Sequence, residues 1–317
     1  MRAPMQWEDL PREAAALRDA QSETAVGIAA RGARLLHRAL TELYLGEPEP
    51  LRAVAWTIAE ARPEVVALRN VGVSAYRTAR EARTGDRMAA AARGVARLAR
   101  LLADTPASLA RRGQPLLPDG AIVTTLGRSE SVRAAVALAG DRIDDVRVIP
   151  TPAPALADGE RGAARRDSRE TSPPEPSPSL QTQGNTQGRH SVSESTQIPP
   201  DDLRAALTDC DIVLLGCTAF LADGSMAADA GTLALVAAAA GHDPPIPVHF
   251  LADTLKLAPW LPAPQDGAGT AAQPPLDIIP PEYVDHVITE DGIRRPGQLL
   301  RAAADLAGWW RMLETPE

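Results

Sequence analysis

The 317-residue sequence is short of aromatic residues and of cysteine. Aromatic side chains make up 3% of the residues and hydrophobic ones 44%. A core therefore has to be built mostly from Ala, Leu, Val and Ile, which suits packed helices and buried parallel strands. The two cysteines, Cys210 and Cys217, stand in no CxxC or similar metal-ligand spacing. We expect both to pack as apolar side chains, in a reducing cytoplasm.

The sequence also lacks a long apolar run and an excess of basic residues. No uninterrupted apolar stretch reaches the roughly 18 residues of a membrane-spanning helix, and no N-terminal segment has the pattern of a cleaved signal, so we expect neither membrane insertion nor secretion. A formal charge of -8 gives no general attraction to nucleic acid or to an anionic membrane. The arginines between Arg93 and Arg112 fit the solvated face of a helix.

Histidine is scarce, and its spacing indicates no metal site. The sequence contains His37, His190, His242, His249 and His286. They form no HxH or HExxH group, so we expect neither a metal nor a cofactor. His249 falls at the end of a predicted strand, where we expect a structural role.

The length of the chain and its hydrophobic pattern indicate two domains. Residues 1–115 have apolar side chains every three or four positions, with breaks at residues 46–50, 62–63, 84–86 and 105–106, which predicts a helical domain. Residues 118–317 change to short apolar strands that alternate with helices, which indicates an α/β, Rossmann-like, doubly wound parallel sheet. The predicted strands are residues 121–125, 146–149, 212–215, 247–251 and 284–288, and the predicted helices of this domain are residues 131–139, 232–240 and 296–313.

A segment of low complexity interrupts the second domain. Residues 158–200 are filled with Ser, Pro, Gln, Gly, Thr and Asn. They cannot bury enough apolar surface to offset the entropy lost on ordering, so we predict a disordered insertion. Within it, only residues 192–198 could supply a remnant strand.

The loop of residues 216–232 lies between a predicted strand and a predicted helix. Its glycines permit tight turns, and the helix that Thr232 opens offers free backbone N–H groups to an anion. Arg128 and Ser129 precede another helix, and Lys256 follows a strand near the same sheet edge, where ligands bind in open α/β sheets. The resulting hypothesis is a ligand or phosphate site made of Arg128, Ser129, Asp223, Gly224, Gly231, Thr232 and Lys256.

Residues 216–232 resemble the "GA…DG…NK-GT" loop of one family: the initiation factor 2B α, β and δ subunits, ribose-1,5-bisphosphate isomerases and methylthioribose-1-phosphate isomerases. Four other segments agree in order with family motifs: residues 61–70 with "ARP…L-N", 121–129 with "ILT…S", 253–256 with "tyK", and 280–283 with 289–293 as "PPEY…iTE-GI". The chain resembles archaeal-type members from about residue 22 to residue 300, without the insertion.

The resemblance implies a catalytic cysteine and aspartate in the isomerase members, and here the sequence departs from the pattern. Gly127 stands where the thiol belongs, and Pro150-Thr151-Pro152-Ala153-Pro154 replaces the "ESRP" turn and its arginine. Ala228-Asp229 replaces "NK", which exchanges a cation for an anion. Thr24-Ala25-Val26 aligns with an "RGA" phosphate contact.

The family carboxylate is harder to place, because the loop can be registered with it on Thr218, on Ser225 or near Asp223. Asp223 is the one candidate for a catalytic role. Its alternative is an ordinary turn residue before Gly224.

Three functions follow as hypotheses. The first is a non-catalytic initiation factor 2B-like protein, which the resemblance implies to be a dimer or larger homo-oligomer that binds a phosphorylated sugar or nucleotide and has a translation initiation factor as partner. The second is a divergent ribose-1,5-bisphosphate isomerase with Cys217 or Asp223 as replacement acid. The third is a paralogue that keeps the fold without the ligand.

Overall fold

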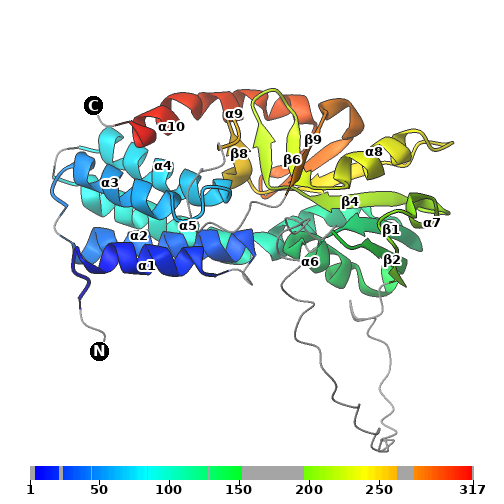
Figure 1. Ribbon diagram of the computed structural model, residues 1–317, viewed down its shortest axis with the longest axis horizontal. Coiled ribbons are helices and arrows are strands. Elements are labelled where there is room, and N and C mark those ends of the chain that lie inside the picture. The colour runs from blue at the N-terminus through cyan, green and yellow to red at the C-terminus, as the bar shows by residue number, and fades with distance from the viewer. Residues whose placement is uncertain are drawn as a thin grey trace, which may run out of the picture.

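The computed structural model describes residues 4–20, 24–43, 45–83, 85–127, 129–151, 196–262 and 275–315. Arg128 and residues 158–195 of the predicted insertion lie outside these ranges. No helix within them combines the length and the apolar character that crossing a membrane requires. The α/β fold that begins with a helical region is confirmed, and the two halves lie side by side in Figure 1.

The helical half consists of five helices whose apolar faces share one core. They are α1 (Asp9–Arg18), α2 (Ala25–Glu42), α3 (Pro48–Ala59), α4 (Val66–Glu81) and α5 (Arg87–Gly113). The predicted breaks at residues 46–50, 62–63 and 84–86 are confirmed. The predicted break at Thr105-Pro106 is wrong, because α5 continues through Pro106. Leu102 and Leu109 on either side of Pro106 are fully buried, and this packing outweighs the backbone hydrogen bond that proline removes.

The main sheet has seven strands in the order β11-β10-β7-β4-β1-β2-β3. All neighbours are parallel except β10 and β11. The strands are β1 (Ala121–Leu126), β2 (Ile143–Ile149), β3 (Thr196–Gln197), β4 (Ile212–Gly216), β7 (Val248–Leu251), β10 (His286–Thr289) and β11 (Gly292–Arg294). Each predicted strand of the sheet is present, and β3 forms inside the segment proposed for a remnant strand.

Helices cover both faces of this sheet. On one face, α6 (Glu130–Ala139) and the end of α5 share a core with Val123, Leu214 and Ile288. On the other face, α7 (Leu203–Leu207), α8 (Thr232–Ala240) and α9 (Leu300–Asp305) pack with Val213, Leu215 and Phe250. The alternation of these strand residues between the two cores is the expected result of strand geometry.

The segment after β4 folds into a second sheet, which the sequence did not predict. Residues expected to form one loop contain β5 (Ala219–Leu221) and β6 (Met226–Asp229), which pair as a hairpin and are flanked by β8 (Leu257–Ala258) and β9 (Leu276–Ile279). The predicted closing helix 296–313 is instead a short 3-10 turn (Pro296–Gln298) followed by α9 and α10 (Ala307–Glu314). In Figure 1, α10 lies back over α3 and α4, and Trp310 and Leu313 enter the core of the helical half.

Candidate functional site

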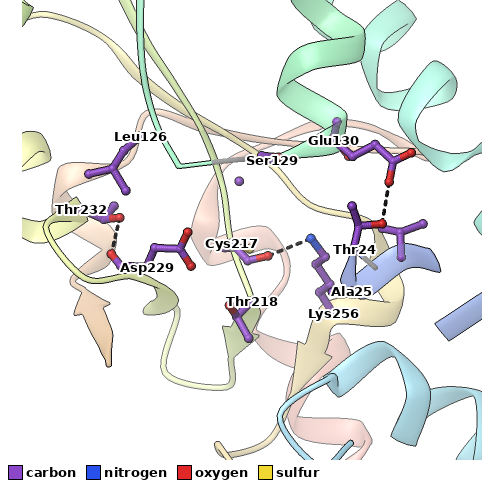
Figure 2. Close-up of a pocket in the computed structure, with 13 residues that line it drawn as sticks. Thr24, Ala25, Leu126, Ser129, Glu130, Cys217, Thr218, Asp229, Thr232 and Lys256 are labelled. Atoms are coloured by element: carbon purple, nitrogen blue, oxygen red, sulfur yellow. Dashed lines mark hydrogen bonds between the residues drawn. The ribbon is translucent and has the colours of Figure 1, made fainter. Parts of the chain in front are cut away.

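A pocket of about 400 Å³ opens at the carboxyl ends of β1 and β4. The chain leaves β1 toward β2 and leaves β4 toward β7, on the opposite side, so the pocket lies at a topological switch point, where open α/β sheets bind ligands. Figure 2 shows its lining residues. They are Thr24, Ala25, Val26, Leu126, Ser129, Glu130, Ser131, Gly216, Cys217, Thr218, Asp229, Thr232 and Lys256.

Three of the residues that the sequence proposed for a ligand site line this pocket, namely Ser129, Thr232 and Lys256. Arg128 lies outside the described residues. The other three, Asp223, Gly224 and Gly231, are not among the lining residues, and their local contacts explain why.

Asp223 forms the turn of the β5–β6 hairpin. Its Oδ1 accepts hydrogen bonds from the backbone N–H (2.9 Å) and the hydroxyl (2.6 Å) of Ser225. These two bonds lower the pKa of the Asp223 carboxyl. Gly224 follows with φ of +89°, a conformation that favours glycine. The carboxylate of Asp223 is thus engaged within its own turn.

The N-terminus of α8 is occupied by a carboxylate of the protein itself. Gly231, with φ of +93°, is the N-cap residue, and Oδ2 of Asp277 on β9 accepts hydrogen bonds from the backbone N–H groups of Gly231 (2.8 Å) and Leu233 (2.9 Å). The Thr232 hydroxyl donates to the carbonyl oxygen of Asp229 at 2.6 Å. The helix end expected to hold a phosphate is therefore already neutralised.

Two further helix N-termini meet at the pocket. Thr24 caps α2, and Ser129 caps α6 by accepting from the backbone N–H of Val132 at 3.4 Å. The Thr24 hydroxyl also donates to Oε2 of Glu130 at 2.7 Å, which brings a carboxylate close to the start of α2. The first N–H groups of a helix have no partner inside it. The start of α6, where Ser129 and Ser131 line the pocket, can bind an external anion only beside Glu130, which is the first residue of this helix.

Lys256 supplies the positive charge of the described lining. Lys256 is the last residue of the 3-10 turn η4 (Thr254–Lys256) and is 8% exposed. Its Nζ donates a hydrogen bond to the carbonyl oxygen of Cys217 at 2.8 Å. It is also the single lysine of the sequence, beside 32 arginines. Its ammonium group is a compact charge with three donors, in contrast to the planar guanidinium of arginine.

Asn70 of α4 holds this turn in place from the helical half. Its Nδ2 donates to the carbonyl oxygens of Leu255 and Leu257, both at 2.7 Å, so that it grips the chain on either side of Lys256. Its Oδ1 accepts from Nε1 of Trp310 at 2.8 Å. The "ARP…L-N" and "tyK" motifs therefore touch each other, and α10 supports their contact.

A buried carboxyl group stands beside Lys256. Asp253 is 2% exposed, and neither of its carboxylate oxygens has a hydrogen-bond partner among the described residues. Burial raises its pKa, and the charge of Lys256 opposes that rise.

The position expected to carry a catalytic thiol has no room for a side chain. Gly127 adopts φ of +76°, and a Cβ added to it would lie 2.7 Å from Oδ2 of Asp229 and 2.9 Å from Oγ1 of Thr151. The Thr151 hydroxyl donates to the same Oδ2 at 3.3 Å. The carboxylate of Asp229 thus fills the space that a side chain at residue 127 would need.

The cysteine of the pocket has the properties of a packed side chain. Cys217 is buried among apolar residues of the core on the α8 side of the sheet. Burial raises the pKa of its thiol to about 11, in spite of the nearby Lys256 charge. Since the thiolate is the reactive form, Cys217 is a weak nucleophile at neutral pH.

Sequence reasoning missed the site roles of Glu130, Asn70 and Asp277. Glu130 could have been found, because it directly follows Ser129 at the start of a predicted helix. Lys256, which the sequence did predict, is also distinguished as the one lysine of an arginine-rich sequence. Nothing local pointed to Asp277, which lies 46 residues from Gly231.

Comparison with known proteins gives a likeness of fold. No protein-family model and no curated sequence matches the chain. A Pyrococcus horikoshii OT3 translation initiation factor eIF-2B structure matches with a TM-score of 0.65 and 19% identity, over 93% of this chain and 100% of that one. The tetrameric eIF2B-beta2-delta2 complex from C. thermophilum matches with a TM-score of 0.66 and 17% identity, over 94% of both chains. The structure of eIF2B beta from Chaetomium thermophilum matches with a TM-score of 0.63 and 16% identity, over 95% of this chain and 91% of that one. The resemblance seen in the motifs is confirmed as a shared fold.

Proposed function

We propose that this chain is a member of the initiation factor 2B family that has no isomerase activity and binds a small phosphorylated ligand, a sugar phosphate or a nucleotide, in the pocket at β1 and β4. The observation that carries the proposal is the contrast within one pocket. The pocket contains the positive charge of Lys256, which attracts an anion. At the position of the family thiol it has Gly127, which carries no side chain.

The family assignment is supported by fold and by motifs together. The likeness of fold covers at least 93% of the chain in each of the three structures compared. The motif residues also come together in space, as Asn70 grips the turn that carries Lys256. A shared fold alone does not determine a function. The proposed function therefore rests on the residues of the pocket.

Binding of a phosphate is supported at the start of α6. There the helix dipole and the first backbone N–H groups favour an anion, and the carboxylate of Glu130 in the same turn opposes it. Lys256 adds a formal charge, and the hydroxyls of Ser129, Thr218 and Thr232 offer hydrogen bonds to a sugar. A pocket of about 400 Å³ has the size of a small-molecule site.

The absence of isomerase activity is argued from acid–base chemistry. Moving a proton between adjacent carbons requires a donor and an acceptor in reach of both carbons. Gly127 can supply neither, and the Asp223 carboxylate is bound within its own turn. The two carboxylates of the described lining, Asp229 and Glu130, lie on opposite sides of the pocket in Figure 2.

A role in an assembly related to translation initiation is part of the proposal. Two of the matching structures are described as a translation initiation factor and as a tetrameric eIF2B complex. By analogy, the chain forms a homodimer or a larger homo-oligomer in the cytoplasm and has a translation initiation factor as partner.

Purified protein tests the proposal when it is assayed with ribose 1,5-bisphosphate, ribose 5-phosphate and AMP. The expected result is a rise in melting temperature with at least one of them, because a ligand that binds the native state stabilises it, and no formation of ribulose 1,5-bisphosphate. Lys256→Met should lose the rise. Asp104→Asn, a change on the exposed face of α5, serves as control and should keep it.

The alternative is a divergent isomerase, which the presence of Cys217 and Asp229 in the same pocket favours. It predicts turnover that Cys217→Ser or Asp229→Asn abolishes. Turnover would overturn the proposal, and a complete lack of both turnover and stabilisation would favour a fold that has lost its ligand.

A further inference from the structure

The charges around the pocket leave room for one phosphate. Among the described lining residues, Lys256 is the single cation, whereas Glu130 and Asp229 are carboxylic acids. Each of the three nearby helix N-termini has a carboxylate of the protein close to it, Glu130 at α2 and in the first turn of α6, and Asp277 at α8. Lys256 and the first N–H groups of α6 are the groups of the described lining that attract an anion, and the buried Asp253 beside Lys256 adds one more carboxyl group, so little positive charge is left for a second phosphate.

Asp229 defines the character of the opposite side. In Figure 2 Asp229 lies on the opposite side of the pocket from Lys256, Thr24 and Glu130, and its carboxylate points toward the middle. Oδ2 is held by the Thr151 hydroxyl and sits over Gly127, which has no side chain to displace it. The Thr232 hydroxyl donates a hydrogen bond to the backbone carbonyl oxygen of Asp229. This side therefore presents a fixed hydrogen-bond acceptor to whatever enters.

A carboxylate in that position repels a phosphate and accepts hydrogen bonds from hydroxyl or amino groups. Like charges brought together in a partly buried pocket oppose binding, and one unfavourable group can decide between two similar ligands. A sugar hydroxyl or an amine, by contrast, satisfies the acceptor at no electrostatic cost.

We propose that Asp229 is a specificity residue that restricts this pocket to ligands with a single phosphate, which carry hydroxyl or amino groups at the end that faces Asp229. This inference rests on the proposed function, since it assumes that the pocket binds a phosphorylated ligand. It narrows the class of ligand to pentose or nucleoside monophosphates and excludes bisphosphates.

Titration calorimetry with ribose 5-phosphate and ribose 1,5-bisphosphate tests the inference on the full chain. The wild type should bind the monophosphate at least about tenfold more tightly, a ratio that corresponds to about 1.4 kcal/mol. Asp229→Asn keeps the size of the side chain and an oxygen that can accept from Thr151. It should reduce the ratio of the two affinities by about tenfold, chiefly because the bisphosphate binds more tightly. Asp229→Ser removes the same charge in a smaller side chain and should give the same direction of change.

Asp104→Asn removes one carboxylate far from the lining and should leave the ratio unchanged. If the wild type binds the monophosphate but both Asp229 variants keep the original ratio, this inference is refuted and the proposed function stands. Tighter binding of the bisphosphate by the wild type refutes it as well. Binding of neither probe by any variant refutes this inference, and the proposed function is refuted with it if AMP also fails to raise the melting temperature.

Discussion

Replacing Asn70 with alanine should destabilise the protein far more than a typical point mutation. The side chain makes three hydrogen bonds, to the carbonyl oxygens of Leu255 and Leu257 and to the indole N–H of Trp310. Alanine leaves all three partners without this bond. The bonds to Leu257 and Trp310 are buried, and that to Leu255 is partly buried.

The magnitude follows from the cost of unsatisfied buried groups. Each costs about 1 to 3 kcal/mol, and the partly buried carbonyl recovers some of this from water. The expected loss is about 3 to 5 kcal/mol, a large part of the roughly 5 to 15 kcal/mol that stabilises most proteins. Since Asn70 also holds the turn that carries Lys256, the variant should bind the phosphorylated ligand less well.

Urea unfolding at about 25 °C, followed by tryptophan fluorescence and by far-ultraviolet circular dichroism, measures the loss. Thr41→Ala is the control, because the exposed Thr41 hydroxyl on α2 bonds to carbonyls of its own helix, and its loss should cost less than about 0.5 kcal/mol. A loss below about 1 kcal/mol for Asn70→Ala would refute the reasoning.

Two further predictions concern titratable groups. Burial and the neighbouring His286 lower the pKa of His249, so the unfolded chain binds a proton at a higher pH than the folded protein does. The stability due to His249 is therefore present above the unfolded pKa of about 6.5 and is lost as the pH falls below it. His249→Gln should therefore flatten the decline of the urea midpoint between about pH 7.5 and about pH 5.5, and an unchanged decline would contradict the assignment. Because the pKa of Cys217 is raised to about 11, a thiol-specific reagent at about pH 8 should label it at least about 100-fold more slowly in native than in urea-unfolded protein; rapid native labelling would contradict this and favour a catalytic thiol.

The sequence predicted the parts of the fold that repeat a local pattern. Residues 212–215 form a continuous apolar run and residues 121–125 and 247–251 are largely apolar, because β4, β1 and β7 are buried on both faces, and such segments are recognisable without partners. The hairpin of β5 and β6 was missed for the opposite reason. Its strands are three and four residues long, and they are held by β8 and β9, which come much later in the chain.

The candidate site was predictable where it follows from strand ends. Ser129, Thr232 and Lys256 follow strands or open helices, and the rule that ligands bind at the carboxyl edge of the sheet brought them together. The use of the α8 N-terminus by Asp277 depends on the second sheet, so local reasoning assigned that helix end to a phosphate. Glu130 gained its role through Thr24, which lies 106 residues away.

The central claim is that a phosphorylated ligand binds beside Lys256. Because Lys256 is the single lysine of the sequence, protein labelled with carbon-13 lysine gives Cε–Hε signal at one carbon shift only, and this peak reports on the pocket alone. Titration with ribose 5-phosphate or with AMP should, for at least one of the two, move the peak saturably, with the same midpoint as the rise in melting temperature. A peak that stays in place while the melting temperature rises would put the ligand elsewhere, and a peak and a melting temperature that both stay unchanged would contradict binding itself.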